Sequence, residues 1–174
     1  MRIIAGKYRG RTLSSFQGDN IRPTPDRVKE SLFQILSGKL SGARVLDLFA
    51  GSGALGIECL SRGASEAVFN DSSRESLSVL EKNLRLVKEG AKPYNLDFRT
   101  LLARVEGQFD LIFCDPPYKE NYLKEILDTV RTRNLLSADG LVVYESEREE
   151  MGAEGWILAD CRKYGRTNIS MWKL

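Results

Sequence analysis

Short apolar runs alternate with longer segments of helical periodicity along most of this chain. The apolar runs predict strands at residues 44–49, 66–70, 93–96, 109–114 and 141–145. Between them, apolar residues recur at the spacing of one helix face, which predicts helices at residues 54–61, 74–89, 99–106 and 121–133. Strands and helices that alternate in this way form βαβ units. We therefore expect a mostly parallel sheet covered by helices.

The two ends of the chain carry a different pattern. Near the C-terminus, residues 156–160 and 167–173 have the composition of strands, and no helix is predicted between them, so we expect an antiparallel hairpin. Near the N-terminus, residues 2–5 and 11–14 flank a turn with Gly6 and predict a basic β-hairpin.

A helix is predicted to begin after this hairpin. Thr24 has the chemistry of an N-cap, Pro25 suits the first helical position, and Asp26 suits the first turn. The apolar stripe expected on this helix consists of Val28, Leu32, Ile35 and Leu36.

Length and charge set limits on the domain organisation. A chain of 174 residues supports one hydrophobic core, so we divide it into a basic N-terminal hairpin at residues 1–20 and one domain at residues 21–174. The net charge is only +2, and attraction to nucleic acid therefore requires a local patch. Residues 1–11 are such a patch, because they include four basic residues and no acidic one.

Composition also excludes several classes of site. The three cysteines, Cys59, Cys114 and Cys161, show no spacing typical of zinc ligands or of a disulfide framework, which favours a reducing cytoplasm. The chain has no histidine, which excludes serine–histidine and cysteine–histidine nucleophilic sites and histidine-rich metal sites. We expect no metal, and no membrane partner, because no apolar stretch approaches the length of a membrane span.

The most distinctive motif is Asp115-Pro116-Pro117-Tyr118, directly after the predicted strand at 109–114. That run is apolar on both faces, so it is predicted in the centre of the sheet, where ligands bind beyond the carboxyl ends of the strands. A carboxylate, proline carbonyls without competing N–H groups and an aromatic ring suit a flat ring that bears an amine. The alternative interpretation is a simple turn after a strand.

A second motif lies upstream. Gly51, Gly53 and Gly56 have the G-x-G-x-x-G spacing of dinucleotide-binding loops. Asp47, at the end of the preceding strand, would oppose a pyrophosphate and attract a cationic ligand, which favours a cofactor with an amino acid and a sulfonium group. The alternative is that these glycines only ease a tight turn.

Taken together, the two motifs resemble those of the class I S-adenosylmethionine-dependent methyltransferases that act on amines. Residues 47–53 match D-x-F-x-G-x-G, and residues 115–118 match (D/N/S)-P-P-(Y/F/W). The segments 2–11, 22–24 and 27–30 narrow the resemblance to the RsmD family, the bacterial 16S rRNA guanine-N2 methyltransferases, over nearly the whole chain.

This resemblance implies an α/β, Rossmann-like fold with a mostly parallel, seven-stranded sheet and a C-terminal antiparallel hairpin. Residues 21–174 would be the methyltransferase domain. The cofactor would be S-adenosyl-L-methionine, and the substrate would be 16S rRNA in the small ribosomal subunit, bound by a monomer in the cytoplasm.

The resemblance also implies residues for the cofactor. The loop from Phe49 to Gly53 would hold its methionine part. Asn70 stands where the family commonly has the ribose-binding acid and Asp71 follows it, so both are candidates. The full set of cofactor-binding candidates is Thr24, Asp47, Phe49, Gly51, Gly53, Asn70, Asp71, Asp97 and Phe98. Asp97 would accept a hydrogen bond from the adenine amine, beside Phe98. As alternatives, Asp71 and Asp97 equally suit the N-caps of the helices that follow them, and Phe98 equally suits the core.

For catalysis, the candidates are Asp115, Pro116, Pro117 and Tyr118. An exocyclic base amine is a poor nucleophile, because its lone pair is delocalised into the ring. The Asp115 carboxylate and the Pro116 carbonyl could each accept one N–H and localise that pair, while Tyr118 stacks on the base, a contact worth about 1–3 kcal/mol. Contacts with RNA phosphates are expected from Arg2, Lys7, Arg9, Arg11 and Arg22, for which a solvated face is the alternative.

Three other functions compete with this interpretation. An adenine-N6 methyltransferase acting on RNA or DNA would share the amine site. A nicotinamide-dependent oxidoreductase could use the same glycines with Asp71 on the ribose. A binding module that kept the fold and lost turnover is the third.

Overall fold

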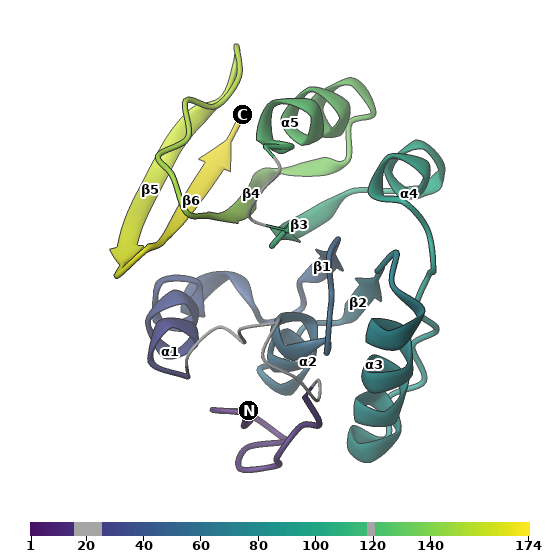
Figure 1. Cartoon of the computed structure of the whole chain (residues 1–174). Helices are drawn as coiled ribbons and strands as arrows, with labels where there is room; N and C mark the ends of the chain where they lie inside the picture. Colours follow the sequence, from purple (N-terminus) through teal and green to yellow (C-terminus); the bar gives the residue numbers. More distant parts are fainter. Residues whose placement is uncertain (16–25, 118–120) are drawn as a thin grey trace.

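The computed structural model describes residues 1–15, 26–117 and 121–174, and a single sheet crosses the molecule (Figure 1). Its six strands among these residues lie in the order β2-β1-β3-β4-β6-β5. Their bounds are β1 Arg44–Asp47, β2 Glu66–Phe69, β3 Phe109–Cys114, β4 Leu136–Ser146, β5 Ile157–Tyr164 and β6 Thr167–Lys173. β2, β1, β3 and β4 run parallel, whereas β6 is antiparallel to both β4 and β5. The predicted C-terminal antiparallel hairpin is therefore confirmed.

Helices cover both faces of this sheet (Figure 1). They are α1 Asp26–Ile35, the short 3-10 helix η1 Ser37–Lys39, α2 Ala54–Ser61, α3 Arg74–Val87, α4 Phe98–Arg104 and α5 Leu123–Thr132. The core side chains of α1, α2 and α3 pack with Val45, Phe113 and Val143 on one face. Those of α4 and α5 pack with Leu46 and their neighbours on the other face. None of the helices in the described part of the chain is long and apolar enough to cross a membrane.

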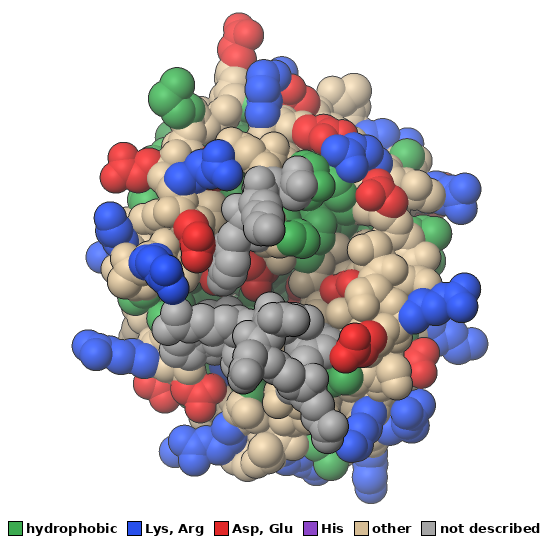
Figure 2. Space-filling view, in the orientation of Figure 1, with side chains coloured by type: hydrophobic (Ala, Val, Ile, Leu, Met, Phe, Trp, Pro, Cys, Tyr) green, Lys and Arg blue, Asp and Glu red, His purple; other side chains and the backbone are tan. Residues whose placement is uncertain are grey.

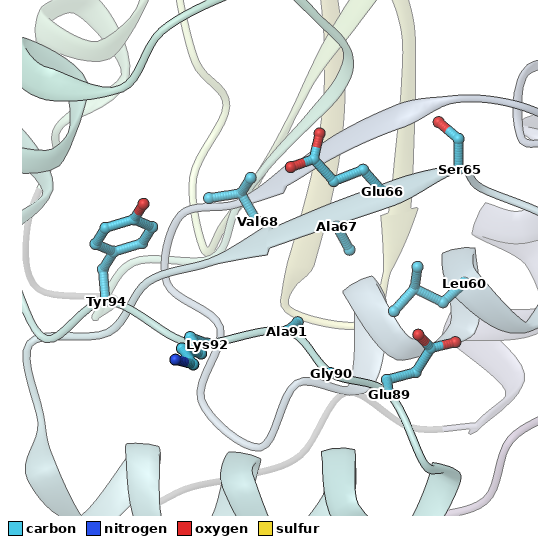
Figure 3. A pocket seen from close by; sticks show the side chains of 10 residues that line it. All are labelled: Leu60, Ser65, Glu66, Ala67, Val68, Glu89, Gly90, Ala91, Lys92 and Tyr94. Carbon is cyan, nitrogen blue, oxygen red and sulfur yellow. The ribbon is translucent and has the colours of Figure 1, made fainter.

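The predicted seventh strand, residues 93–96, is reduced to a single parallel bridge between Asn70 and Tyr94. Pro93 has no N–H to donate to a ladder, and the Asn95 side chain instead donates to the carbonyls of Asp71 and Ser72. A hollow of about 470 Å³ lies beside β2, with Lys92 among its lining residues (Figure 3).

The first helix agrees with its prediction in part. Its expected N-cap Thr24 and Pro25 lie outside the described residues, and Asp26 is in the first turn. Ile35 was wrongly assigned to the apolar stripe, because it is 37% exposed, whereas Phe33 is fully buried. The buried face of the helix therefore includes Phe33 on one side, and Ile35 lies outside it on the other side.

The N-terminal segment, residues 1–15, forms a hairpin-like turn in which an antiparallel bridge joins Arg2 and Thr12. The backbone N–H of Ile3 donates to Arg11 at 3.0 Å. The segment then docks on the end of α2, where Ser61 accepts from the backbone N–H groups of both Lys7 and Tyr8. The predicted β-hairpin is thus present as a single bridge instead of two strands, and the boundary that we placed at residue 20 lies outside the described residues.

A buried charge cluster on α1 and α2 also binds the N-terminal segment. The Glu58 carboxylate of α2 accepts from the backbone N–H groups of Ile4 and Ala5 and from Arg62. Its other neighbour is the Lys29 ammonium at 3.3 Å, and the side chains of Lys29 and Glu58 are both fully buried. Lys29 also donates to the Arg2 carbonyl at 2.8 Å. One carboxylate therefore links α1, α2 and the N-terminal segment.

Gly6→Ala is expected to destabilise this docked segment more than Gly10→Ala does. Both glycines have positive φ, +82° and +84°, so each substitution carries a backbone cost of about 1–2 kcal/mol. A Cβ on Gly6 would lie 1.8 Å from the Ser61 carbonyl oxygen, whereas a Cβ on Gly10 meets no atom within 4 Å. We expect an additional loss of about 1–3 kcal/mol for Gly6→Ala, measured by chemical unfolding and by proteolysis of the N-terminal segment. Equal losses in the two variants would contradict this docking.

Candidate active site

Two of the predicted site residues meet at the carboxyl ends of neighbouring strands. Asp47 ends β1 and pairs in register with Phe113 of β3, and Asp115 follows two residues after Phe113. Because side chains alternate along a strand, Asp115 projects to the same side as Phe113, the face covered by α1 and α2. Asp47 lies between Leu46 and Leu48, which pack on the opposite face, so it also projects toward α1 and α2. The register therefore brings both carboxylates to one side of the sheet.

Asp47 is buried at the start of the glycine loop. Its carboxylate accepts from the backbone N–H of Gly56 at 3.0 Å, in the first turn of α2. Burial raises the pKa of Asp47 to about 7; the Gly56 N–H acts against this rise, and the charge of Asp71 adds to it. The loop is thus closed by a carboxyl group whose negative charge a nearby cation would stabilise.

Asp115 lies in a more strongly acidic environment. Burial raises the pKa of the Asp115 carboxyl well above its usual range, and the charges of Glu145 and Asp47 raise it further. Among the described residues, no lysine or arginine forms an ion pair with Asp47 or Asp115. Pro116 is buried and Pro117 exposed, while Tyr118 lies outside the described residues. Figure 2 shows acidic and hydrophobic side chains in a hollow in the middle of the side of the molecule that it views.

Glu145 is a candidate site residue that the sequence did not indicate. It is buried near the end of β4, and the pairing of Cys114 with Tyr144 places it beside Asp115. It lines a small cavity with Asp115, Leu32 and Leu55. The signal in the sequence was a carboxylate at the end of the predicted strand 141–145, because ligands bind beyond the carboxyl ends of parallel strands.

The glycine loop takes the form that its motif predicts. Gly51 and Gly53 have φ values of +54° and +81°, which favour glycine, and Gly53 is the residue that precedes α2. The backbone N–H of Gly51 donates to Asp71 Oδ2 at 2.8 Å. Asp71 also accepts from the N–H of Ser73, so it shapes both the loop and the approach to α3.

The two ribose candidates have different surroundings. Asn70 is buried, and its amide is used within the fold: Nδ2 donates to the carbonyls of Leu48 and Leu96, and Oδ1 accepts from the N–H of Leu96. Asp71 is half-buried at the surface of the site. The Asn70 amide therefore links the segment after β1 to the segment that contains Leu96, whereas Asp71 presents a carboxylate beside the glycine loop.

The adenine candidates lie at the start of α4. The Asp97 carboxylate accepts from the N–H of Arg99 as the N-cap, and Phe98 is buried with only 4% exposure. Phe98 packs against the rings of Phe49 and Tyr122, with centroids 5.3 and 4.8 Å away. Phe49 and Tyr122 are half-buried, so they offer more ring surface than Phe98 does. Tyr122 is a further candidate that the sequence did not indicate, and Thr24 lies outside the described residues.

The basic RNA-binding candidates lie on the docked N-terminal segment. Arg2, Lys7, Arg9 and Arg11 are exposed, and Arg22 lies outside the described residues. Lys7 forms an ion pair with Glu89 at 3.0 Å, and Arg11 donates to the Leu86 carbonyl at 2.7 Å. Both cations also lie over the ring of Tyr8. These contacts hold part of the basic segment in a defined arrangement on α3.

Comparison with known proteins identifies the family. The family model described as "Conserved hypothetical protein 95", that of the RsmD family, matches residues 1–173. The chain belongs to the RsmD family. Ribosomal RNA small subunit methyltransferase D of Haemophilus influenzae is 36% identical, with 99% of this chain and 93% of that protein covered. The protein of the same name from Escherichia coli strain K12 is 39% identical over 86% of this chain and 76% of its own length.

Solved structures agree with this family assignment. The Escherichia coli protein yhhF superposes with a TM-score of 0.88 at 35% identity, covering 99% of this chain and 96% of its own. The predicted class I methyltransferase fold is confirmed, with six strands in the described part of the chain where seven were expected. As a member of the RsmD family, the protein is a methyltransferase, and the oxidoreductase alternative was wrong.

Proposed function

We propose that this protein transfers a methyl group from S-adenosyl-L-methionine to the exocyclic N2 amine of a guanine in 16S rRNA. The observation that carries this proposal is the position of Asp115 and Pro116 at the end of the central strand β3, one strand away from the Asp47 glycine loop. The relatives of Haemophilus influenzae and Escherichia coli are named for methylation of small-subunit rRNA, which supports the choice of RNA.

The site suits a cationic cofactor. When bound, S-adenosyl-L-methionine supplies an electrophilic methyl group on a positively charged sulfonium. Asp47 is buried and Asp115 is half-buried, and the pKa values of both carboxyls are raised, so such a charge would stabilise both as anions. Asp47 and the backbone of Gly51 and Gly53 would hold the methionine part.

For the remaining cofactor contacts, we favour Asp71 over Asn70 on the ribose hydroxyls, because the Asn70 amide is already hydrogen-bonded within the fold. Asp97 would accept from the adenine amine. The adenine ring would contact the aromatic group of Phe49, Phe98 and Tyr122.

Asp115 and Pro116 prepare the target amine. The Asp115 carboxylate and the Pro116 carbonyl each accept one N–H of the amine, so that its lone pair points away from both acceptors. Pro116 contributes an acceptor without a competing N–H, at a fixed backbone angle. Once the new N–C bond has formed, the amine nitrogen carries a positive charge, and Asp115 is positioned to take its proton. Orientation supplies much of the rate in such a site. We assign Pro117 and Tyr118 to support of the base.

RNA is bound through the N-terminal segment. Arg2, Lys7, Arg9 and Arg11 are exposed there, and with Arg22 they would contact phosphates, which gives affinity and register without base selection. Selection of the base would depend on the shape of the RNA in the small subunit. We propose that a monomer acts on the assembled subunit in the cytoplasm.

Product analysis tests this proposal. Small ribosomal subunits that lack the modification are incubated with the protein and S-adenosyl-L-methionine, digested to nucleosides and examined by mass spectrometry. We expect N2-methylguanosine in 16S rRNA, and sequencing of the digested fragments locates the nucleotide. N6-methyladenosine would support the alternative adenine methyltransferase, and binding of S-adenosylhomocysteine without any product would favour a module that has lost turnover.

A further inference from the structure

Glu145 is a second carboxylate beside Asp115, the proposed acceptor of the target amine. The pairing of Phe113 with Val143 and of Cys114 with Tyr144 places Asp115, one residue beyond β3, beside Glu145 of the adjacent parallel strand β4. Phe113 and Val143 both pack on the α1–α2 face, so the residues two positions later project to that face as well. Both carboxylates line the same small cavity with Leu32 of α1 and Leu55 of α2.

The edges of purine bases differ in a way that two such acceptors can distinguish. The guanine edge that carries the N2 amine also carries the N1–H, so it presents adjacent donors. An adenine edge presents its N6 amine beside an N1 lone pair, which is an acceptor. An ionised carboxylate can only accept hydrogen bonds. Two adjacent carboxylates therefore suit guanine, and they place an acceptor against the adenine N1.

We propose that Glu145 is a specificity-determining residue that accepts the N1–H of the target guanine while Asp115 accepts from its N2 amine. This inference rests on the proposed function and adds the reason for guanine over adenine. A buried acceptor opposite a base acceptor leaves both groups unpaired, and unpaired polar groups of this kind produce strong discrimination between substrates. Glu145 thus selects the base that Asp115 activates.

The test combines a base analogue with an isosteric variant. Small subunits are reconstituted with 16S rRNA that carries either guanine or 2-aminopurine at the nucleotide located by the product analysis. 2-Aminopurine keeps the C2 amine and has a lone pair at N1 in place of the N1–H. We expect the wild-type protein to prefer guanine by about 10- to 100-fold in kcat/KM. In Glu145→Gln this preference is expected to shrink to within about threefold, because a glutamine amide can either accept from N1–H or donate to the N1 lone pair.

Two further variants keep the result interpretable. Glu147→Gln, two residues later and exposed, is the matched control and should keep the wild-type preference. Glu145→Asp retains a carboxylate on a shorter side chain, so it should lose turnover and still prefer guanine. S-adenosylhomocysteine binding by each variant, measured by calorimetry, reports an intact fold.

The outcomes separate this inference from the proposed function. If the wild-type protein forms no N2-methylguanosine, the proposed function fails and the inference fails with it. If it methylates guanine and 2-aminopurine equally, or if Glu145→Gln keeps the wild-type preference, methylation stands and the role of Glu145 is wrong.

Discussion

Asp115→Ala is expected to lower the turnover of methyl transfer by at least about 10²-fold and to leave S-adenosylhomocysteine binding nearly unchanged. The carboxylate lies at the end of β3, whereas the glycine loop that would hold the cofactor follows β1. Removal of the side chain takes away the acceptor that we propose orients the amine, and such an acceptor would act mainly on the reaction step. The charges of Glu145 and Asp47 oppose ionisation of the Asp115 carboxyl in the folded protein and raise its pKa, so the fold should tolerate the loss of this group.

Single-turnover methylation of small subunits, with calorimetry for S-adenosylhomocysteine, separates the two effects. Asp115→Asn keeps an oxygen acceptor and loses the charge, so it should retain more turnover than Asp115→Ala. Asp139→Ala, an exposed aspartate in β4, is the control and should behave as wild type. Near-normal turnover of Asp115→Ala would show that another group orients the amine.

Glu58→Ala is expected to cost about 3–5 kcal/mol of unfolding free energy, the largest stability effect that we predict for one side chain. The change leaves the Lys29 ammonium fully buried without its carboxylate. It also removes the acceptor of the backbone N–H groups of Ile4 and Ala5, which then lose their hydrogen bonds. A buried charge without a partner costs more than the pair contributed when it was intact, because its desolvation is no longer compensated.

Urea unfolding measures this loss. Glu81→Ala is the control. Glu81 pairs with Arg85 at 3.8 Å with the same i, i+4 helical spacing as Glu58 and Arg62, but both of its side chains are exposed. This substitution should therefore change the free energy of unfolding by less than about 0.5 kcal/mol. Glu58→Gln should fall between the two, and Lys29→Met in the Glu58→Gln background should recover part of the loss, since no charge is then left buried beside the amide. A Glu58→Ala loss no larger than that of the control would show that Lys29 finds another partner or reaches water.

The local elements of this protein were well predicted because their signals are local. Gly51 and Gly53 favour the positive φ values that the turn after β1 requires, and β3 was predicted to the residue from its apolar run. The strand predicted at 93–96 is only a single bridge. The prediction took account of its apolar residues but not of two effects that oppose strand pairing: Pro93 has no N–H, and the Asn95 side chain bonds to backbone carbonyls. Whether a short apolar segment becomes a strand depends on its hydrogen bonds with a neighbouring strand.

The order of the elements, the two motifs and the family could be predicted from the amino-acid sequence, because each depends on residues that are close along the chain. Only the tertiary structure showed that Glu145 stands beside Asp115, that Lys29 is buried against Glu58, and that the Asn70 amide is used within the fold. These relations join residues that are far apart in sequence. They are fixed by strand register and helix packing, which depend on the whole core being assembled at once.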